Sequence, residues 1–190
     1  MEIERFVIGW WETNCYLLIC KDELAIVDPG PGIGKVLNEI KKLKAKPKYI
    51  INTHYHLDHT FSNRILKKET GAEILIHEAE KKYISFLGFK VDRFLKDSDE
   101  IKIGNEALKV IHTPGHSKGS ICLLGEGFVL TGDTFFKDAI PVTHFPGGSQ
   151  KDLESSWKKL SKFLKQGIKI FPGHNEIFEY DETSKGLLRY

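Results

Sequence analysis

The sequence predicts an α+β protein in which two mixed β-sheets pack together and helices cover their outer faces. Short apolar runs of strand length alternate with amphipathic helical stretches in each half of the chain, and Gly, Pro, Asn and Asp residues separate them. The chain has 190 residues and is 41% hydrophobic, which is enough for one domain over residues 1–190 with a substantial core. Sheets and helices in this order bury their apolar faces best as stacked layers.

The first half of the sequence predicts strands and helices in turn. Asp58 suits the N-cap of the second helix, and Phe61, Ile65 and Leu66 are expected on its buried side. The predicted elements are strands over 1–8, 13–20 and 24–27, a helix over 34–43, a strand over 48–52, a helix from Asp58 to about Gly71, and a strand over 72–76.

The second half is richer in strands. Residues 77–97 are expected to be helix with an irregular connection, and four short strands follow, joined by Gly-containing turns that suit hairpins. The predicted elements are strands over 101–103, 107–111, 120–124 and 128–131, a helix over 150–165 with Ser149 as N-cap and Leu153, Trp157, Leu160 and Leu164 on one side, and a last strand over 168–171.

The run His-x-His-x-Asp-His carries the strongest chemical signal. It places three histidines and an aspartate within six residues, directly after an apolar strand. His54 and His56 lie two residues apart, so at a strand end both side chains leave on the same side and can bind one ion. Asp58 and His59 project from the following helix and can serve a second ion. Ordinary polar histidines with Asp58 as an N-cap are the alternative, which leaves the complete run unexplained.

Three further stretches place a His or an Asp directly after an apolar strand. His116 stands in Thr-Pro-Gly-His-Ser, Asp133 in Thr-Gly-Asp-Thr, and His174 in Pro-Gly-His-Asn. Each alone is more often a turn residue, but four such stretches are typical of a site built from loops on a rigid scaffold. Asp28 follows a strand in Val-Asp-Pro-Gly, where a turn-forming role is the alternative.

Together these motifs resemble the metallo-β-lactamase superfamily, and the stretches around His116 and Asp133 look most like its hydroxyacylglutathione hydrolase (glyoxalase II) branch. The resemblance implies a four-layer αββα sandwich. It also implies the site roles: His54, His56 and His116 would hold one divalent metal ion, Asp58, His59 and His174 a second, Asp133 would bridge both, and Asp28 would fix a ligating His from outside the metal sphere.

Zinc is the first expectation for these two ions, and iron or manganese stays open because His and Asp ligands bind all three. Two divalent ions keep a residual positive charge beside two aspartates and a hydroxide, which lowers the pKa of bound water and stabilises an oxyanion. We therefore predict a metal-dependent hydrolase in which a bridging hydroxide, oriented by the catalytic Asp58, attacks the carbonyl of a small thioester or ester.

Three other functions stay open. A persulfide dioxygenase-like enzyme of the same superfamily would bind one iron through two His and one Asp. A phosphodiesterase or RNA-processing nuclease of the same superfamily would need a basic surface. A protein stabilised by its metals, without activity, would have closed metal sites.

The sequence leaves the substrate-binding residues unknown. They are expected in the loops around residues 9–12, 84–97 and 137–149, where Trp10 and Trp11 are candidates either to line a pocket or to pack in the core.

Charged and polar residues near the motifs are secondary candidates. Some small relatives carry an Arg where this chain has Val142, and Lys118 and Lys137 are the nearest replacements in sequence, although an exposed Lys is the commoner outcome. His144 is a candidate to border the site, whereas His77 and His112 are expected to be structural.

Composition and charge exclude several classes of partner. The net charge of +2 is below that of a dedicated nucleic-acid binder, and no apolar run approaches the roughly 20 residues that cross a bilayer. A small-molecule substrate is expected, with no nucleic acid and no membrane, and the oligomeric state stays unknown. Cys15, Cys20 and Cys122 have no paired spacing and are expected to be buried thiols in a reducing compartment, so a soluble, cytoplasmic protein is expected.

Overall fold

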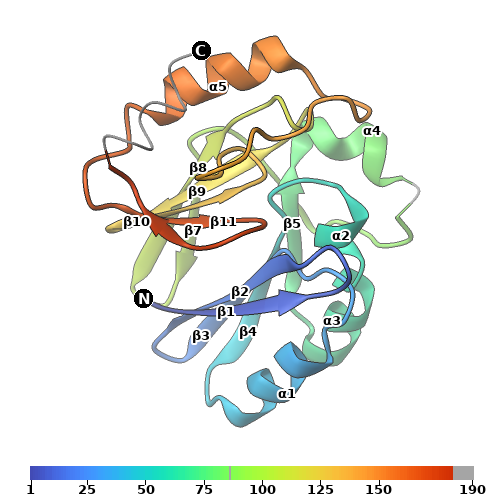
Figure 1. Ribbon diagram of the computed structural model, residues 1–190. Coiled ribbons are helices and arrows are strands. Elements are labelled where there is room, and N and C mark those ends of the chain that lie inside the picture. The colour runs from blue at the N-terminus through green and yellow to red at the C-terminus, as the bar shows by residue number, and fades with distance from the viewer. Residues whose placement is uncertain (86, 182–190) are drawn as a thin grey trace.

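The computed structural model describes residues 1–85 and 87–181, and its first feature is a six-stranded mixed sheet (Figure 1). The first three strands are antiparallel and the last four run parallel, because helices connect β3 to β4 and β4 to β5. In spatial order the strands are β1 (Glu2–Ile8), β2 (Thr13–Cys20), β3 (Glu23–Val27), β4 (Lys46–Ile51), β5 (Glu73–His77) and β6 (Arg93–Leu95).

A second six-stranded sheet packs on the first. Its strands are antiparallel except for β10 and β11, which run parallel with α5 between them in sequence. In spatial order they are β12 (Phe178–Glu179), β11 (Lys169–Pro172), β10 (Phe128–Gly132), β9 (Ile121–Gly125), β8 (Glu106–His112) and β7 (Glu100–Ile103).

Helices lie on the outer faces of both sheets. Figure 1 shows α1 and α3 outside the first sheet and α5 outside the second. The helices are α1 (Gly34–Lys42), α2 (Leu57–Thr60), α3 (Asn63–Thr70), α4 (Lys81–Ile84, after a 3₁₀ turn over Glu78–Glu80) and α5 (Gln150–Leu160).

Three separate apolar clusters hold these layers together. One lies between the sheets and includes Val27, Ile51 and Leu130. A second packs α1 and α3 on the first sheet, and a third packs α5 on the second sheet. Each cluster fills one interface of a four-layer sandwich, so the predicted αββα architecture is confirmed.

The helix predicted from Asp58 to about Gly71 is wrong in detail. The structure divides it into α2 and α3, because Ser62 donates its hydroxyl to the carbonyl of Gly30 at 2.6 Å and fixes a bend. Of the three side chains predicted on its buried side, only Leu66 is buried, while Phe61 and Ile65 are 61% and 47% exposed. The N-cap of α2 is His56, so Asp58 lies in the first turn and not at the cap.

Smaller differences concern element ends. Helix α5 stops at Leu160 rather than Lys165, because the chain tightens there into turns, with Phe163 N bonded to Leu160 O. Its N-cap is Ser149, as predicted, and its four predicted apolar residues are buried. The 77–97 segment contains β6, and β12 follows the strand that was predicted to be the last.

The three cysteines are buried free thiols, as predicted. Within residues 1–85 and 87–181, no helix has the length and apolar character needed to cross a membrane.

Candidate metal centre

All seven predicted ligands lie shortly after the carboxyl end of a strand, five in loops and two, Asp58 and His59, in the short helix α2. The strands β3 and β4 run parallel, as do β10 and β11, so the carboxyl ends of each pair meet at one edge of its sheet. Such an edge collects loops from distant parts of the sequence. His54, His56, Asp58 and His59 follow β4, His116 follows β8, Asp133 follows β10, and His174 follows β11.

His54, His56 and His116 form the first group of potential ligands. One nitrogen from each ring lies within 4.8 Å of the others, and Nδ1 of His56 is 2.9 Å from Nε2 of His116. Atoms bound to one tetrahedral zinc at about 2.0–2.1 Å stand about 3.4 Å apart. The spacing of these nitrogens therefore fits ligands that share an ion.

Asp58, His59 and His174 form the second group. Nε2 of His174 lies 3.2 Å from Oδ2 of Asp58 and 3.2 Å from Nε2 of His59. The distance from Asp58 Oδ2 to His59 Nε2 is 3.3 Å. These three atoms form a nearly equilateral triangle, which is one face of a tetrahedral site.

Asp133 lies between the two groups. Its Oδ2 is 3.4 Å from Nε2 of His116 in the first group and 3.5 Å from Nε2 of His174 in the second. Its Oδ1 is 3.5 Å from Nε2 of His59. The structure thus brings all seven residues together, with one carboxylate in reach of both groups.

Backbone carbonyls orient two of the rings. Nδ1 of His116 lies 2.7 Å from the carbonyl of Val142, and Nδ1 of His174 lies 2.9 Å from the carbonyl of Trp11. Because a carbonyl only accepts, each Nδ1 carries the proton that it donates. In a neutral ring Nε2 is then left with its lone pair toward the site, as metal ligation requires.

The loop that carries His174 is anchored on the first hairpin. Asn14 donates its backbone N–H to Gly173 at 2.7 Å and its side-chain amide to Pro172 at 2.9 Å. Tyr16 donates its hydroxyl to the same carbonyl of Pro172 at 2.7 Å. These contacts join the second and the eleventh strand, β2 and β11, and fix the position of the last ligand.

Asp28 connects the two groups from behind. Its carboxylate accepts hydrogen bonds from the backbone N–H and the hydroxyl of Thr53, both at 2.7 Å, and its Oδ2 lies 3.1 Å from Nδ1 of His59. The same hydroxyl of Thr53 is 3.1 Å from Nδ1 of His54. Asp28 also turns the backbone, with φ of 52°, so the turn-forming role coexists with the contact to His59.

Two polar atoms that face the site have no hydrogen-bond partner. They are Nε2 of His54 and Oδ1 of Asp133, and both are buried. An unpaired buried polar atom costs free energy, so such atoms in a native site call for an explanation. A donor set of five imidazoles and two carboxylates fits a pair of divalent ions, which would satisfy both atoms.

The first group is electrically neutral at neutral pH. Burial lowers the pKa of His54 well below its usual value, and the neighbouring His59 and His116 lower it further. Burial and then the charge of His116 lower the pKa of His56 to about 4. Neutral imidazole is the form that binds a metal, so the first group needs no deprotonation before loading.

The second group behaves in the opposite way. Burial lowers the pKa of His59, but the carboxylates of Asp133 and Asp28 outweigh it and hold that pKa well above its usual value. Burial raises the pKa of Asp58, yet hydrogen bonds from His174 and His59 outweigh it and hold that pKa far below the usual range. In the metal-free protein a proton on His59 therefore balances the negative charge of these carboxylates, and a bound cation would displace that proton.

Two glycines give the centre its clearance. A Cβ on Gly173 would stand 2.2 Å from Oδ1 of Asp133 and 2.8 Å from Cε1 of His59. A Cβ on Gly30 would stand 1.8 Å from the carbonyl oxygen of Asp58. The Pro-Gly pairs of the motifs are thus needed for close packing of backbone and ligands as well as for their turns.

A pocket of about 760 Å³ opens onto the centre. Its size lies within the range of small-molecule sites. The three loops predicted to determine the substrate all contribute to its wall. The lining residues are Trp11, Tyr55, His56, Leu57, Asp58, Tyr83, Leu87, His116, Asp133, Phe136, Ile140, Pro141, Val142, Phe145 and His174.

Sequence reasoning missed four of these lining residues: Tyr55, Leu57, Tyr83 and Phe136. Tyr55 and Leu57 lie inside the histidine run, and that position was the available signal. Of the paired tryptophans, Trp11 lines the pocket and is 63% exposed, while Trp10 is 95% exposed, so neither packs in the core.

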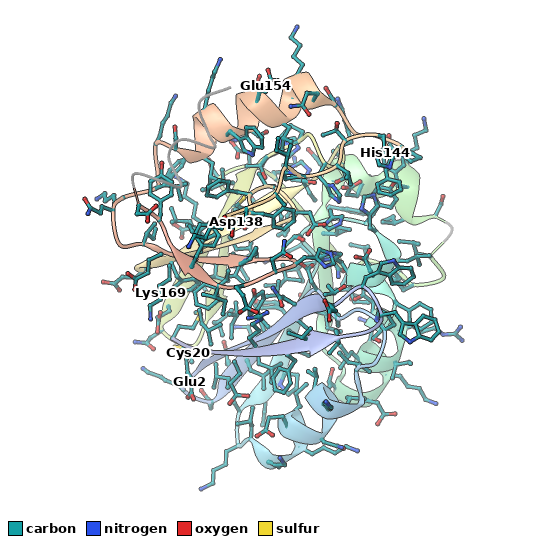
Figure 2. All side chains as sticks on the ribbon, in the orientation of Figure 1. Glu2, Cys20, Asp138, His144, Glu154 and Lys169 are labelled. Carbon is teal, nitrogen blue, oxygen red and sulfur yellow. The ribbon has the colours of Figure 1, made fainter. Side chains whose placement is uncertain are left out.

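The other histidines and lysines lie outside the lining of the pocket. His77 and His112 stack on each other with ring centroids 3.9 Å apart, in keeping with a structural role. His144 is exposed on the loop before α5, at the upper right of Figure 2, where its ring stands beside Phe145. Lys118 faces Asp152 at 3.7 Å, and Lys137 is exposed.

A family model described as the metallo-beta-lactamase superfamily matches residues 8–174. The chain belongs to this superfamily. Among its relatives, the probable polyketide biosynthesis zinc-dependent hydrolase PksB of Bacillus subtilis is 28% identical over 169 residues, which cover 87% of this chain and 74% of PksB.

Solved structures share the fold of this chain. ETHE1 from Myxococcus xanthus superposes with a TM-score of 0.82 and 22% identity, over 94% of this chain and 80% of ETHE1. TTHA1623, solved in a di-iron-bound form, gives a TM-score of 0.84 and 23% identity, over 93% of this chain and 94% of TTHA1623.

Proposed function

We propose that the protein is a dinuclear metal-dependent hydrolase that cleaves small thioesters or esters, as hydroxyacylglutathione hydrolases do. The observation that carries the proposal is the completeness of both ligand groups around Asp133, in the wall of an open pocket. Zinc is the expected metal, with iron or manganese as alternatives, since PksB is described as zinc-dependent and TTHA1623 holds two irons.

When bound, two divalent ions supply a water of lowered pKa as nucleophile and positive charge for the oxyanion of the substrate. Asp58 lines the pocket, and its side chain is 22% exposed. A cation held by His59 and His174 would keep the carboxylate of Asp58 ionised, so Asp58 could accept a hydrogen bond from the water and orient it toward the carbonyl carbon.

The pocket supports water as the nucleophile. Among the described residues that line it there is no Ser, Cys or Lys, the side chains that most often attack a carbonyl directly. Asp58 and Asp133, its two carboxylates, are both engaged with histidines of the centre. The chain therefore offers positioning and charge, and the attacking oxygen comes from water.

The alternatives fit less well. A metal-stabilised protein without activity would enclose its ions, whereas the described pocket reaches both ligand groups. A phosphodiesterase or nuclease would grip phosphates with Lys or Arg, and no described lining residue is of either type. A dioxygenase with one iron would need only two His of the first group and Asp133, whereas Asp58, His59 and His174 are all in place.

Elemental analysis of the purified protein, followed by a panel of thioester, ester, phosphodiester and persulfide substrates, tests the proposal. We expect two divalent ions per chain and turnover of thioesters or esters. One iron per chain with thiol-dependent oxygen uptake would identify a dioxygenase and overturn the proposal.

The role of Asp58 is tested by Asp58→Asn, which keeps the shape of the side chain and removes its charge. We expect turnover to fall by about 100-fold or more. Asp138→Asn is the matched control, because Asp138 is exposed on the loop before α5, outside the pocket lining (Figure 2). Full turnover of Asp58→Asn at full metal content would refute this mechanism.

A further inference from the structure

The pocket wall collects the exposed apolar side chains of the protein. Across the described residues, nine large hydrophobic side chains are exposed, and five of the nine line this pocket. Such clustering marks a binding surface, since isolated exposed apolar residues are scattered over most proteins. The five are Trp11, Leu57, Ile140, Val142 and Phe145.

Aromatic rings extend this apolar wall down to the metal centre. Tyr55 and Tyr83 stack with centroids 4.9 Å apart, and Phe145 contacts the ring of His56 at 5.1 Å. The hydroxyl of Tyr55 donates to the carbonyl of Pro146 at 3.0 Å, so its polar end is occupied by the protein. The wall therefore presents ring faces and aliphatic groups to a ligand.

Positive side chains are missing from the same wall. Among the described lining residues there is no Lys or Arg, and the charged side chains are those of the metal centre itself. Lys118 faces Asp152 at 3.7 Å, and Lys82 lies 6.0 Å from the ring centroid of Tyr83, but neither lines the pocket. A carboxylate on a substrate would be desolvated in this wall without a partner, which costs free energy.

We propose that the substrate carries an uncharged apolar acyl group, a straight alkyl chain of about six or more carbons or an aromatic ring, and that acyl groups ending in a carboxylate are rejected. This inference rests on the proposed function and specifies its substrate class. In the reaction the acyl C–S bond breaks and a C–O bond to water forms. The products are a carboxylic acid, which ionises, and a thiol that takes the second proton of the water.

The first test measures kcat/KM for thioesters of one neutral thiol, N-acetylcysteamine, with acetyl, butanoyl, hexanoyl, octanoyl and adipoyl groups. Adipoyl matches hexanoyl in chain length and replaces its terminal methyl by a carboxylate. We expect each added CH₂ to raise kcat/KM by about fourfold until the chain fills the pocket. Hexanoyl should exceed adipoyl by about tenfold or more. Equal or higher kcat/KM for adipoyl would overturn the inference.

The second test introduces a cation into the wall with Val142→Arg. Because a hydrogen bond to a charged group contributes about 1.5–3 kcal/mol, the hexanoyl-to-adipoyl ratio should fall by about tenfold or more. Ile65→Arg is the matched control, because it adds the same charge at a residue outside the pocket lining. The exposed fraction of Ile65 is 47%, against 44% for Val142. Ile140→Arg, at a lining residue that is 56% exposed, repeats the test if Val142→Arg does not fold. An unchanged ratio in a folded lining variant would overturn the inference.

A binding measurement separates this inference from the proposed function. Ketone analogues with CH₂ in place of the thioester sulfur cannot be hydrolysed, and Trp11 in the wall reports their binding by fluorescence. We expect the ketone analogue of the hexanoyl thioester to bind at least about tenfold more tightly than the ketone analogue of the adipoyl thioester, and Trp11→Phe to remove the signal. If this preference holds while no thioester is cleaved, the apolar site stands and the hydrolase proposal fails. If thioesters are cleaved without this preference, the hydrolase proposal stands and the apolar-substrate inference fails.

Discussion

Asp28→Asn removes one negative charge from behind the metal centre and keeps the shape of the side chain. The Asp28 carboxylate is 1% exposed and has three close partners, the N–H and hydroxyl of Thr53 and Nδ1 of His59. In the variant, the side-chain amide has only one oxygen that can accept a hydrogen bond. Its NH₂ group therefore faces a donor at one of these positions, and the hydrogen bond at that position is lost. The lost hydrogen bond to a charged group is worth about 1.5–3 kcal/mol, which corresponds to about 10- to 100-fold in affinity for the second ion.

Competition with a chromophoric chelator measures the affinity of each ion in turn. The first ion should lose less affinity than the second, because Asp28 reaches His54 only through the hydroxyl of Thr53. Asp22→Asn, at an exposed residue between β2 and β3, is the control and should bind both ions as the unmodified protein does. If folded Asp28→Asn retained its full affinity for the second ion, the positioning role of Asp28 would be wrong.

Three further predictions follow from the centre and its surroundings. Gly173→Ala should not bind the second ion, because the added methyl group would collide with Asp133 and His59. Elemental analysis measures the metal content, and two ions per chain in the folded variant would contradict this prediction. Removing the ions with a chelator should lower Tm by about 8 °C or more. A metal ion at a free concentration about a thousand times its Kd adds about 4 kcal/mol to the free energy of unfolding, and the chelator removes this contribution. An unchanged Tm would argue against metal sites in the folded state. Burial raises the pKa of Glu80 from 4.5 to about 7, against hydrogen bonds from Ser117 and Gly119. The folded state then holds the proton more tightly than the unfolded state, so the free energy of unfolding should decline by about 3 kcal/mol between pH 4.5 and 7, and urea unfolding of Glu80→Gln should lack this decline.

The sheets could be predicted from sequence because their signals are local. Apolar runs such as Leu24–Val27, stopped by Asp-Pro-Gly, define a strand and its end without knowledge of the rest of the chain. The division between α2 and α3 could not be predicted, since Ser62 is fixed by the carbonyl of Gly30, 32 residues away in sequence. The predicted buried positions of Phe61 and Ile65 require one continuous helix, which the structure divides into α2 and α3.

The centre could be predicted as a set of residues, because each stretch has the same local signal: a His or Asp shortly after an apolar strand. Part of the pocket wall could not, since Tyr83 and Phe136 lie outside the predicted loops and meet the centre only in the folded protein. The clearance role of Gly173 was hidden for the same reason, because it depends on Asp133 and His59 in two other loops.

The anchoring of the His174 loop on Asn14 and Tyr16 has a consequence for biosynthesis. During translation the second ligand group stays open until the ribosome has released β11, although the first group is complete once His116 has emerged. The first group therefore leaves the ribosome in full before the second, whose assembly waits for contact between the two ends of the chain, which is a slow kind of contact. Any product cut short before His174 lacks a member of the second ligand group.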